Sequence, residues 1–147
     1  MIKKVSIALV AIMGAIFFFE TTKVSLNGSQ SLPYKVFVSF KGMSFKRGDL
    51  VLIVGHKPKY FPPVSLIKRV VGMEGDSIAP YLKDLKIKTK TRRGQPLNPL
   101  KAKSVPKGYV FVQADHPDSF DSRYEEFGLV KVESIWGRSF GFWRTKK

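Results

Sequence analysis

The residue whose setting most suggests chemistry is Lys68, in the stretch 65–76. Leu66 and Val70 flank it at alternate positions, and alternate side chains of a strand point to the same face. If Arg69 faces water, Lys68 faces the core, where loss of hydration lowers a lysine pKa from about 10.4 toward neutrality. A neutral amine beside a serine hydroxyl is a general base. The alternative is a solvated lysine on an edge strand.

Serine hydroxyls for such a base are found in a turn earlier in the chain. An Asn-Gly pair at 27–28 is a strong turn signal, and Pro33 favours extended backbone just before it. Ser29 and Ser31 therefore lie on a tight, partly extended loop. Such a loop can present a hydroxyl and its own backbone N–H to a carbonyl, as acyl transfer requires. Serine is common in all loops, so this signal alone is weak.

Composition narrows the function classes. The 147 residues support one domain with a modest core, and the net charge of +15 indicates an anionic partner, either nucleic acid or a membrane surface. The absence of cysteine excludes disulfides, a thiol nucleophile and cysteine-ligated metal. With only His56 and His116, we expect no metal cluster and no cofactor. His116 is a second candidate base for a serine, but the setting of Lys68 is more specific.

The N-terminus has three parts: two lysines at positions 3 and 4, an unbroken apolar run over 5–19, and polar residues from Glu20. At about 1.5 Å per residue this run is short for a full span, which leaves a cleavable secretory signal or an uncleaved signal anchor. No small-residue cleavage site follows the run, so we favour an anchor over 1–22. The lysines then stay cytoplasmic, and residues 23–147 lie across the membrane. A buried N-terminal helix is the alternative.

Beyond the anchor, the pattern is typical of a mostly β domain. Apolar runs and alternation predict strands at 36–40, 50–54, 108–113 and 128–135, besides the strand that carries Lys68. The run 50–54 is continuous, which indicates burial on both faces. Four aromatic residues follow the last predicted strand and either pack on the sheet or lie in a membrane interface: Trp136, Phe140, Phe142 and Trp143.

A basic segment, residues 83–107, interrupts this pattern. It contains three prolines and a single acidic residue, Asp84, against nine basic ones: Lys83, Lys86, Lys88, Lys90, Arg92, Arg93, Lys101, Lys103 and Lys107. We expect a β-ribbon or loop inserted beyond the core rather than a second domain. It either attracts anionic lipid head groups or an acidic partner, or is a solvated basic face. Nucleic acid is not expected as a partner, because no recognised binding module accompanies the charge.

A polar loop over 114–123 follows the strand 108–113. Asp121 and Arg123 are spaced for a bidentate ion pair that could brace this loop. Ser119 is a further hydroxyl in the loop, and it could hold an amine in place.

Four motifs in this order resemble the signal peptidase I family of S26-type Ser-Lys peptidases: Ser31-Leu32-Pro33, Arg47-Gly48-Asp49-Leu50-Val51, Ile67-Lys68-Arg69-Val70-Val71-Gly72 with Gly75-Asp76, and Ser119-Phe120-Asp121-Ser122-Arg123 with Gly128. Each is weak alone, but their order behind a predicted anchor is specific. The resemblance implies a signal-peptidase-like β-fold catalytic domain with one N-terminal transmembrane helix. Its activity would be that of a membrane-anchored endopeptidase that removes signal peptides.

The resemblance also implies a role for each site residue. Ser31 would be the nucleophile and Lys68 the general base. The backbone N–H of Ser31 and the hydroxyl of Ser29 would hold the oxyanion, Ser119 would orient Lys68, and the ion pair of the polar loop would be structural. The expected partners are a precursor protein and membrane lipid, for a monomer in the bacterial cytoplasmic (inner) membrane with its catalytic domain on the periplasmic side.

Departures from the family pattern narrow the expectation. General signal peptidases have Ser-Met-x-Pro, but Gln30 stands three residues before Pro33. The serine two residues before the proline is similar to the Ser-(Met/Leu)-Pro form of TraF-type conjugative transfer peptidases, which process a pilin precursor. Glu74 replaces the usual proline before Gly-Asp, and residues 114–116 read Ala-Asp-His instead of Gly-Asp-Asn. Neither change falls on a residue of the expected chemistry.

Three other functions compete with this one. A non-catalytic, membrane-anchored basic subunit of a secretion or conjugation apparatus predicts that Ser31 and Lys68 can be replaced by alanine without loss. A periplasmic nucleic-acid-binding protein predicts steeply salt-dependent binding. A self-cleaving Ser-Lys repressor needs an N-terminal DNA-binding domain, and the residues before Ser31 are mostly the predicted anchor.

Overall fold

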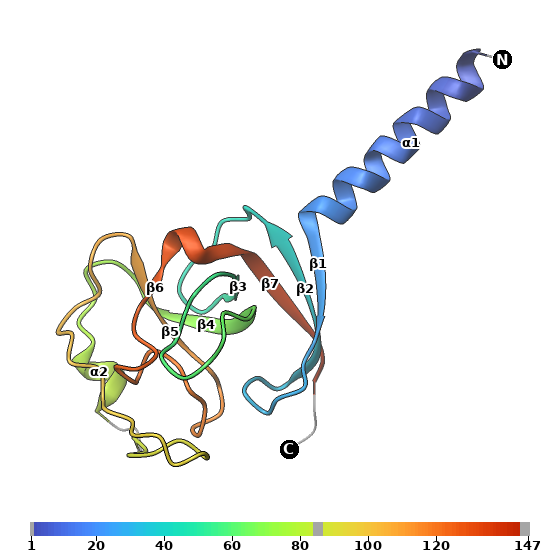
Figure 1. Ribbon diagram of the computed structural model, residues 1–147. Coiled ribbons are helices and arrows are strands. Elements are labelled where there is room, and N and C mark those ends of the chain that lie inside the picture. Colours follow the sequence, from blue (N-terminus) through green and yellow to red (C-terminus); the bar gives the residue numbers. More distant parts are fainter. Residues whose placement is uncertain (1, 84–86, 145–147) are drawn as a thin grey trace.

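The computed structural model describes residues 2–83 and 87–144. Helix α1 (Ile2–Thr21) extends away from the rest of the molecule and continues directly into strand β1 (Thr22–Leu26), as Figure 1 shows. Nothing among the described helices is both long and apolar enough to cross a membrane. The anchor expected over residues 1–22 therefore stays a prediction.

The domain after α1 is built on one seven-stranded sheet with the order β1-β2-β7-β3-β4-β5-β6, in which every neighbouring pair is antiparallel. The mostly β prediction is confirmed. Besides β1, its strands are β2 (Tyr34–Lys41), β3 (Leu50–Ile53), β4 (Leu66–Gly72), β5 (Tyr109–Gln113), β6 (Val130–Lys131) and β7 (Ile135–Arg144). Two short helices complete it, α2 (Ala79–Leu82) and the 3-10 turn η1 (Val132–Ser134).

The end of the chain differs from the sequence-based expectation. The predicted strand 128–135 is only the two-residue β6 followed by η1, and the long strand is β7. The four C-terminal aromatic residues belong to β7 itself, which lies between β2 and β3 in the interior of the sheet. Glycine makes this possible, because a Cβ on Gly137 would lie 1.8 Å from the carbonyl oxygen of Phe40. β7 and β2 thus approach too closely for any side chain at that point.

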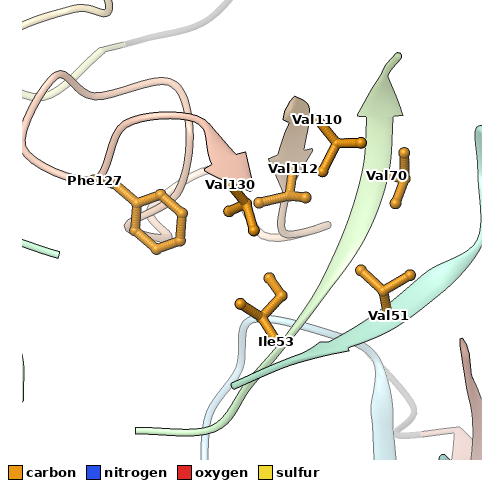
Figure 2. Packing of buried hydrophobic residues seen from close by; sticks show 7 residues of the cluster. All are labelled: Val51, Ile53, Val70, Val110, Val112, Phe127 and Val130. Atoms are coloured by element: carbon orange, nitrogen blue, oxygen red, sulfur yellow. The ribbon is translucent and has the colours of Figure 1, made fainter. Parts of the chain in front are cut away.

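The main core fills one face of the strands that carry the candidate site. β3 is buried along its whole length, as predicted from its continuous apolar run. Its Val51 and Ile53 pack with Val70 of β4 and with apolar side chains of later segments, a cluster shown in Figure 2 and completed by Val110, Val112, Phe127 and Val130. This dense packing fixes the position of β4.

Over its described residues, 83 and 87–107, the basic segment is a loop, but it does not lie beyond the core as expected. Asp84 and Lys86 lie outside the described residues. Leu100 and Val105 are buried and pack with Ile78 and with Phe111 of β5 in a second apolar cluster. Leu97 is also buried. The apolar residues between the lysines therefore hold this segment against the sheet, so removing it would open the core. Sequence reasoning missed this because the charge and the prolines dominate the pattern.

Candidate active site

Lys68 is a buried residue of β4, with only 5% of its surface exposed. It pairs with Val51 of β3, and Leu66 and Val70 flank it on its own strand. Arg69 points the other way, is half-exposed, and forms an ion pair of 2.7 Å with Asp115. The prediction that Lys68 faces the core while Arg69 faces outward is therefore confirmed.

The surroundings of Lys68 favour its neutral form. Burial lowers the pKa of the Lys68 amine, and the Arg123 guanidinium lowers it further, whereas the Asp121 carboxylate raises it. Burial is the largest of the three influences. Since a lysine can accept a proton only when it is neutral, this shift is in the direction that a general base near neutral pH requires.

The loop between β1 and β2 brings serine hydroxyls to the same place. Leu32 buries its side chain beneath the loop with Phe37 and Leu50. Ser29, Ser31 and Lys68 together line a cavity of about 160 Å³, whose remaining wall is formed by Ser25, Leu26, Asn27, Leu32, Phe37, Leu52, Ser65, Leu66 and Ile67. The β1–β2 loop and strand β4, which are far apart in the sequence, thus meet at one cavity. It combines hydroxyls, one buried amine and apolar side chains.

Hydrogen bonds within the loop connect its two cavity serines. The Ser31 backbone N–H donates to the Ser29 hydroxyl at 3.4 Å, and the Ser29 hydroxyl donates to Oδ1 of Asn27 at 3.0 Å. The hydrogen bond from the Ser31 N–H to Ser29 is long, so it is weak and easily broken. Across the described residues no hydrogen bond joins the side chains of Ser31 and Lys68.

Asn27 is the residue of this loop that sequence reasoning treated only as a turn signal. Its Oδ1 accepts from both the N–H and the hydroxyl of Ser29, each at 3.0 Å. Its Nδ2 donates to the carbonyls of Leu32 at 3.0 Å and Tyr34 at 2.8 Å. A side-chain amide next to a glycine indicates a turn, but no sequence pattern shows that it bonds on both sides of Ser31.

The polar loop is braced by a buried ion pair, as its spacing predicted. Nε of Arg123 lies 2.6 Å from one oxygen of Asp121, and its NH2 group lies 2.8 Å from the other. Arg123 also donates to the carbonyls of Pro117 at 2.8 Å and Ser119 at 2.9 Å. Asp121 accepts from the N–H of Ala114 at 2.9 Å. The pair therefore ties both ends of the loop together beside Lys68.

Ser119, His56 and His116 do not line the cavity. Ser119 is buried within the braced loop, but no contact between its hydroxyl and Lys68 is among the hydrogen bonds of the described residues. His116 donates its backbone N–H to the Ser31 carbonyl at 3.1 Å, while its ring Nδ1 accepts from the N–H of Asp118. His56 lies elsewhere, against Phe127. Neither histidine side chain lines the cavity.

Taken together, the cavity has the groups that acyl transfer needs. The hydroxyls of Ser29 and Ser31 and a lysine amine whose pKa burial lowers line the cavity, and the backbone N–H of Ser31 lies beside the Ser29 hydroxyl. In the described ranges 2–83 and 87–144, no three His, Cys, Asp or Glu side chains are grouped to hold a metal ion.

Comparison with known proteins places this architecture in a family. The model of the family described as signal peptidase, peptidase S26, matches residues 1–143. The mitochondrial inner membrane protease subunit 2 of Danio rerio is 32% identical over 102 residues, which are 69% of this chain and 45% of that protein. The mitochondrial ATP-independent inner membrane protease subunit 1b of Arabidopsis thaliana is 40% identical over 100 residues, 67% of this chain and 49% of that protein.

These matches cover about half the length of the two curated relatives, but nearly the whole of this chain is covered by the family model. The match includes β1, the serine loop, the lysine strand and the braced polar loop. The chain therefore belongs to the signal peptidase family, peptidase S26.

Proposed function

We propose that this protein is a signal-peptidase-type serine endopeptidase in which Ser31 is the nucleophile and Lys68 the general base. The observation that carries the proposal is the shared cavity, where the Ser31 loop meets a buried lysine amine whose pKa is lowered by that burial. Ser31 attacks the scissile carbonyl, and Lys68 accepts the hydroxyl proton. Lys68 then passes that proton to the leaving amine, and water hydrolyses the acyl-enzyme.

The oxyanion of the tetrahedral intermediate is held by the Ser31 N–H and the Ser29 hydroxyl. In the free protein these two groups bond to each other, and the Ser29 hydroxyl donates to Asn27. Substrate must therefore displace the long Ser31–Ser29 bond and turn the Ser29 hydroxyl toward the cavity. Removing one such donor typically lowers kcat by about 10²–10³-fold. Ser119 orients Lys68 from the braced loop in this proposal, and the Asp121–Arg123 pair keeps that loop in place.

We further propose that α1 and an adjoining sheet face contact a membrane. Apolar side chains of α1 are exposed, Phe17 and Phe19 among them. At the end of β1 away from α1, Leu26 of β1, Val36 of β2 and Phe142 of β7 lie side by side in register, and Leu26 and Phe142 are exposed. A contiguous exposed apolar face of this kind is typical of an interaction surface. The names of both relatives describe inner membrane proteases, which supports the same location.

The proposed substrate is a precursor protein cleaved after small residues near the end of its signal or leader peptide. The spacing of Ser31 and Pro33 favours a narrower version, the maturation of a pilin precursor for conjugative transfer. The catalytic domain then lies on the periplasmic side of a bacterial cytoplasmic membrane.

The test is cleavage of precursors by the full-length chain in membranes. A pilin precursor and a set of secretory precursors are incubated with the intact protein and with Ser31→Ala and Lys68→Ala, and products are identified by mass spectrometry. Matched controls are Ser44→Ala and Lys57→Ala, which change an exposed serine and an exposed lysine outside the cavity. We expect product from the intact protein and both controls, and none from the two cavity variants.

Three results would overturn the proposal. If Ser31→Ala and Lys68→Ala cleave as well as the intact protein, catalysis does not use this pair; if no form of the chain, the intact protein included, yields product, the chain is better described as a non-catalytic basic subunit. If Lys68→Arg is active, Lys68 is not the base, because a guanidinium does not deprotonate in proteins. Cleavage of secretory precursors but not of the pilin precursor would remove only the conjugation-specific version.

A further inference from the structure

We infer that Asn27 is a positioning residue for the oxyanion-binding groups, an inference that rests on the proposed function. It stands at the first position of the loop that carries Ser29 and Ser31, directly after β1. Its own N–H closes the base of the loop by donating to the Lys35 carbonyl at 2.8 Å. The side chain is thereby fixed at the root of the loop and reaches across it.

The Asn27 amide uses its full hydrogen-bonding capacity. A side-chain amide has two acceptor positions and two donor hydrogens. Both acceptor positions are taken by Ser29, through its N–H and its hydroxyl, and both hydrogens go to the carbonyls of Leu32 and Tyr34. The acceptor half thus holds the residue two positions before Ser31, and the donor half holds the residue directly after it.

This arrangement sets where the oxyanion groups point. The N–H and the hydroxyl of Ser29 both donate hydrogen bonds to Oδ1 of Asn27. The Ser29 backbone is therefore held in place, and only its hydroxyl can turn between Asn27 and the cavity. The second proposed donor, the Ser31 N–H, is directed toward that same hydroxyl. Outside the Asn27 bonds, Ser31 is held by the His116 N–H on its carbonyl and by the buried side chain of Leu32.

A donor stabilises an oxyanion best when little has to reorient during the reaction. Asn27 fixes the position of the Ser29 backbone and oxygen, so that only the hydroxyl hydrogen has to turn toward the cavity. Without the Asn27 side chain, the buried Leu32 side chain still anchors the loop, but Ser29 is no longer held. The expected consequence is a loss in kcat with a smaller change in KM, because substrate binding to the cavity walls remains. A misplacement of about 1 Å can lower the rate by about 10²-fold.

The test is a double-mutant cycle between Asn27→Ala and Ser29→Ala, using the precursor that the intact protein cleaves. We expect Asn27→Ala to lower kcat by about 10–100-fold in the intact background, but by less than about threefold when Ser29 is already alanine. Asn98→Ala is the matched control, because Asn98 also bonds through its amide, to Glu126, but outside the cavity. It should leave kcat unchanged.

A second readout needs no substrate. Amide hydrogen exchange of the full-length chain should show a protected Ser29 N–H that becomes fast-exchanging in Asn27→Ala. An equal loss of kcat in both backgrounds, an unchanged kcat, or an unprotected Ser29 N–H in the intact protein would each overturn the inference. If the intact protein cleaves no precursor while Ser29 stays protected, the proposed function has failed, and Asn27 then holds the loop for structural reasons only.

Discussion

Replacing Asp121 by asparagine is the perturbation that most directly tests how the polar loop is held. Asp121 and Arg123 are almost completely buried, with 0% and 1% of their side chains exposed. Asp121 accepts four hydrogen bonds, from the N–H of Ala114, the N–H of Arg123 and two guanidinium nitrogens. An asparagine has one acceptor oxygen, and its NH2 group would face N–H donors of Ala114 or Arg123 from which it cannot accept.

The expected loss of stability follows from this burial. Breaking a buried ion pair by removing one partner typically costs about 3–5 kcal/mol, since a charge is left uncompensated. For a urea m-value of about 1.5 kcal/mol/M, this lowers the unfolding midpoint by about 2–3 M. Replacing both partners, as in Asp121→Leu with Arg123→Met, removes the charge altogether. That double variant should lie closer to the intact protein than Asp121→Asn does.

The assay is urea unfolding followed by circular dichroism and tryptophan fluorescence. Glu133→Gln is the control, because it breaks the exposed ion pair between Lys131 and Glu133 and should leave the midpoint unchanged. A midpoint for Asp121→Asn equal to that of the intact protein would refute the reasoning. A double variant less stable than the single one would show that the pair contributes more than charge compensation.

Three further predictions concern Lys68 and the sheet. The value of kcat/KM should rise with pH to a plateau as Lys68 loses its proton. Asp121→Asn should move this rise to lower pH, because Asp121 raises the pKa of Lys68. The measurement is a pH-rate profile of the intact protein and of the variant. Burial lowers the pKa of folded Lys68 below its unfolded value of about 10.4, so the stability contributed by the neutral amine is complete above that pH. It is lost as the pH falls toward the folded pKa, by up to about 1.4 kcal/mol per pH unit; urea midpoints should show this slope in the intact protein and not in Lys68→Met. Gly137→Ala should destabilise the sheet by about 1–3 kcal/mol or more, because its Cβ would meet the Phe40 backbone, whereas Gly28→Ala, with no atom within 4 Å of its Cβ, should leave the thermal midpoint nearly unchanged.

Local patterns in the sequence were sufficient to predict much of the candidate site. The alternation around Lys68 predicted its burial, because neighbouring side chains of a strand must point to opposite faces. The spacing of Asp121 and Arg123 predicted their ion pair, and the Asn-Gly pair predicted the serine loop. Each of these depends on residues only a few positions apart, so the chain's own geometry determines them.

The order of motifs also predicted the family and the mostly β fold. It did not predict the position of β7, because strand pairing joins residues far apart in sequence, and only the close approach at Gly137 shows which strands meet there. Nor did it predict that the basic segment contributes Leu100 and Val105 to the core. Charge and proline content indicate that a segment is exposed, whereas its burial depends on whether its apolar residues pack against the rest of the fold.

The sequence by itself determined which side chains are available, a serine on a turn and a lysine that must face apolar neighbours. Only the tertiary structure decided that Ser29, Ser31 and Lys68 line one cavity, and that Asn27 bonds on both sides of Ser31. The physical reason is that hydrogen bonds and desolvation act over a few ångströms in space. Those distances are set when the β1–β2 loop and β4 come together in the folded sheet.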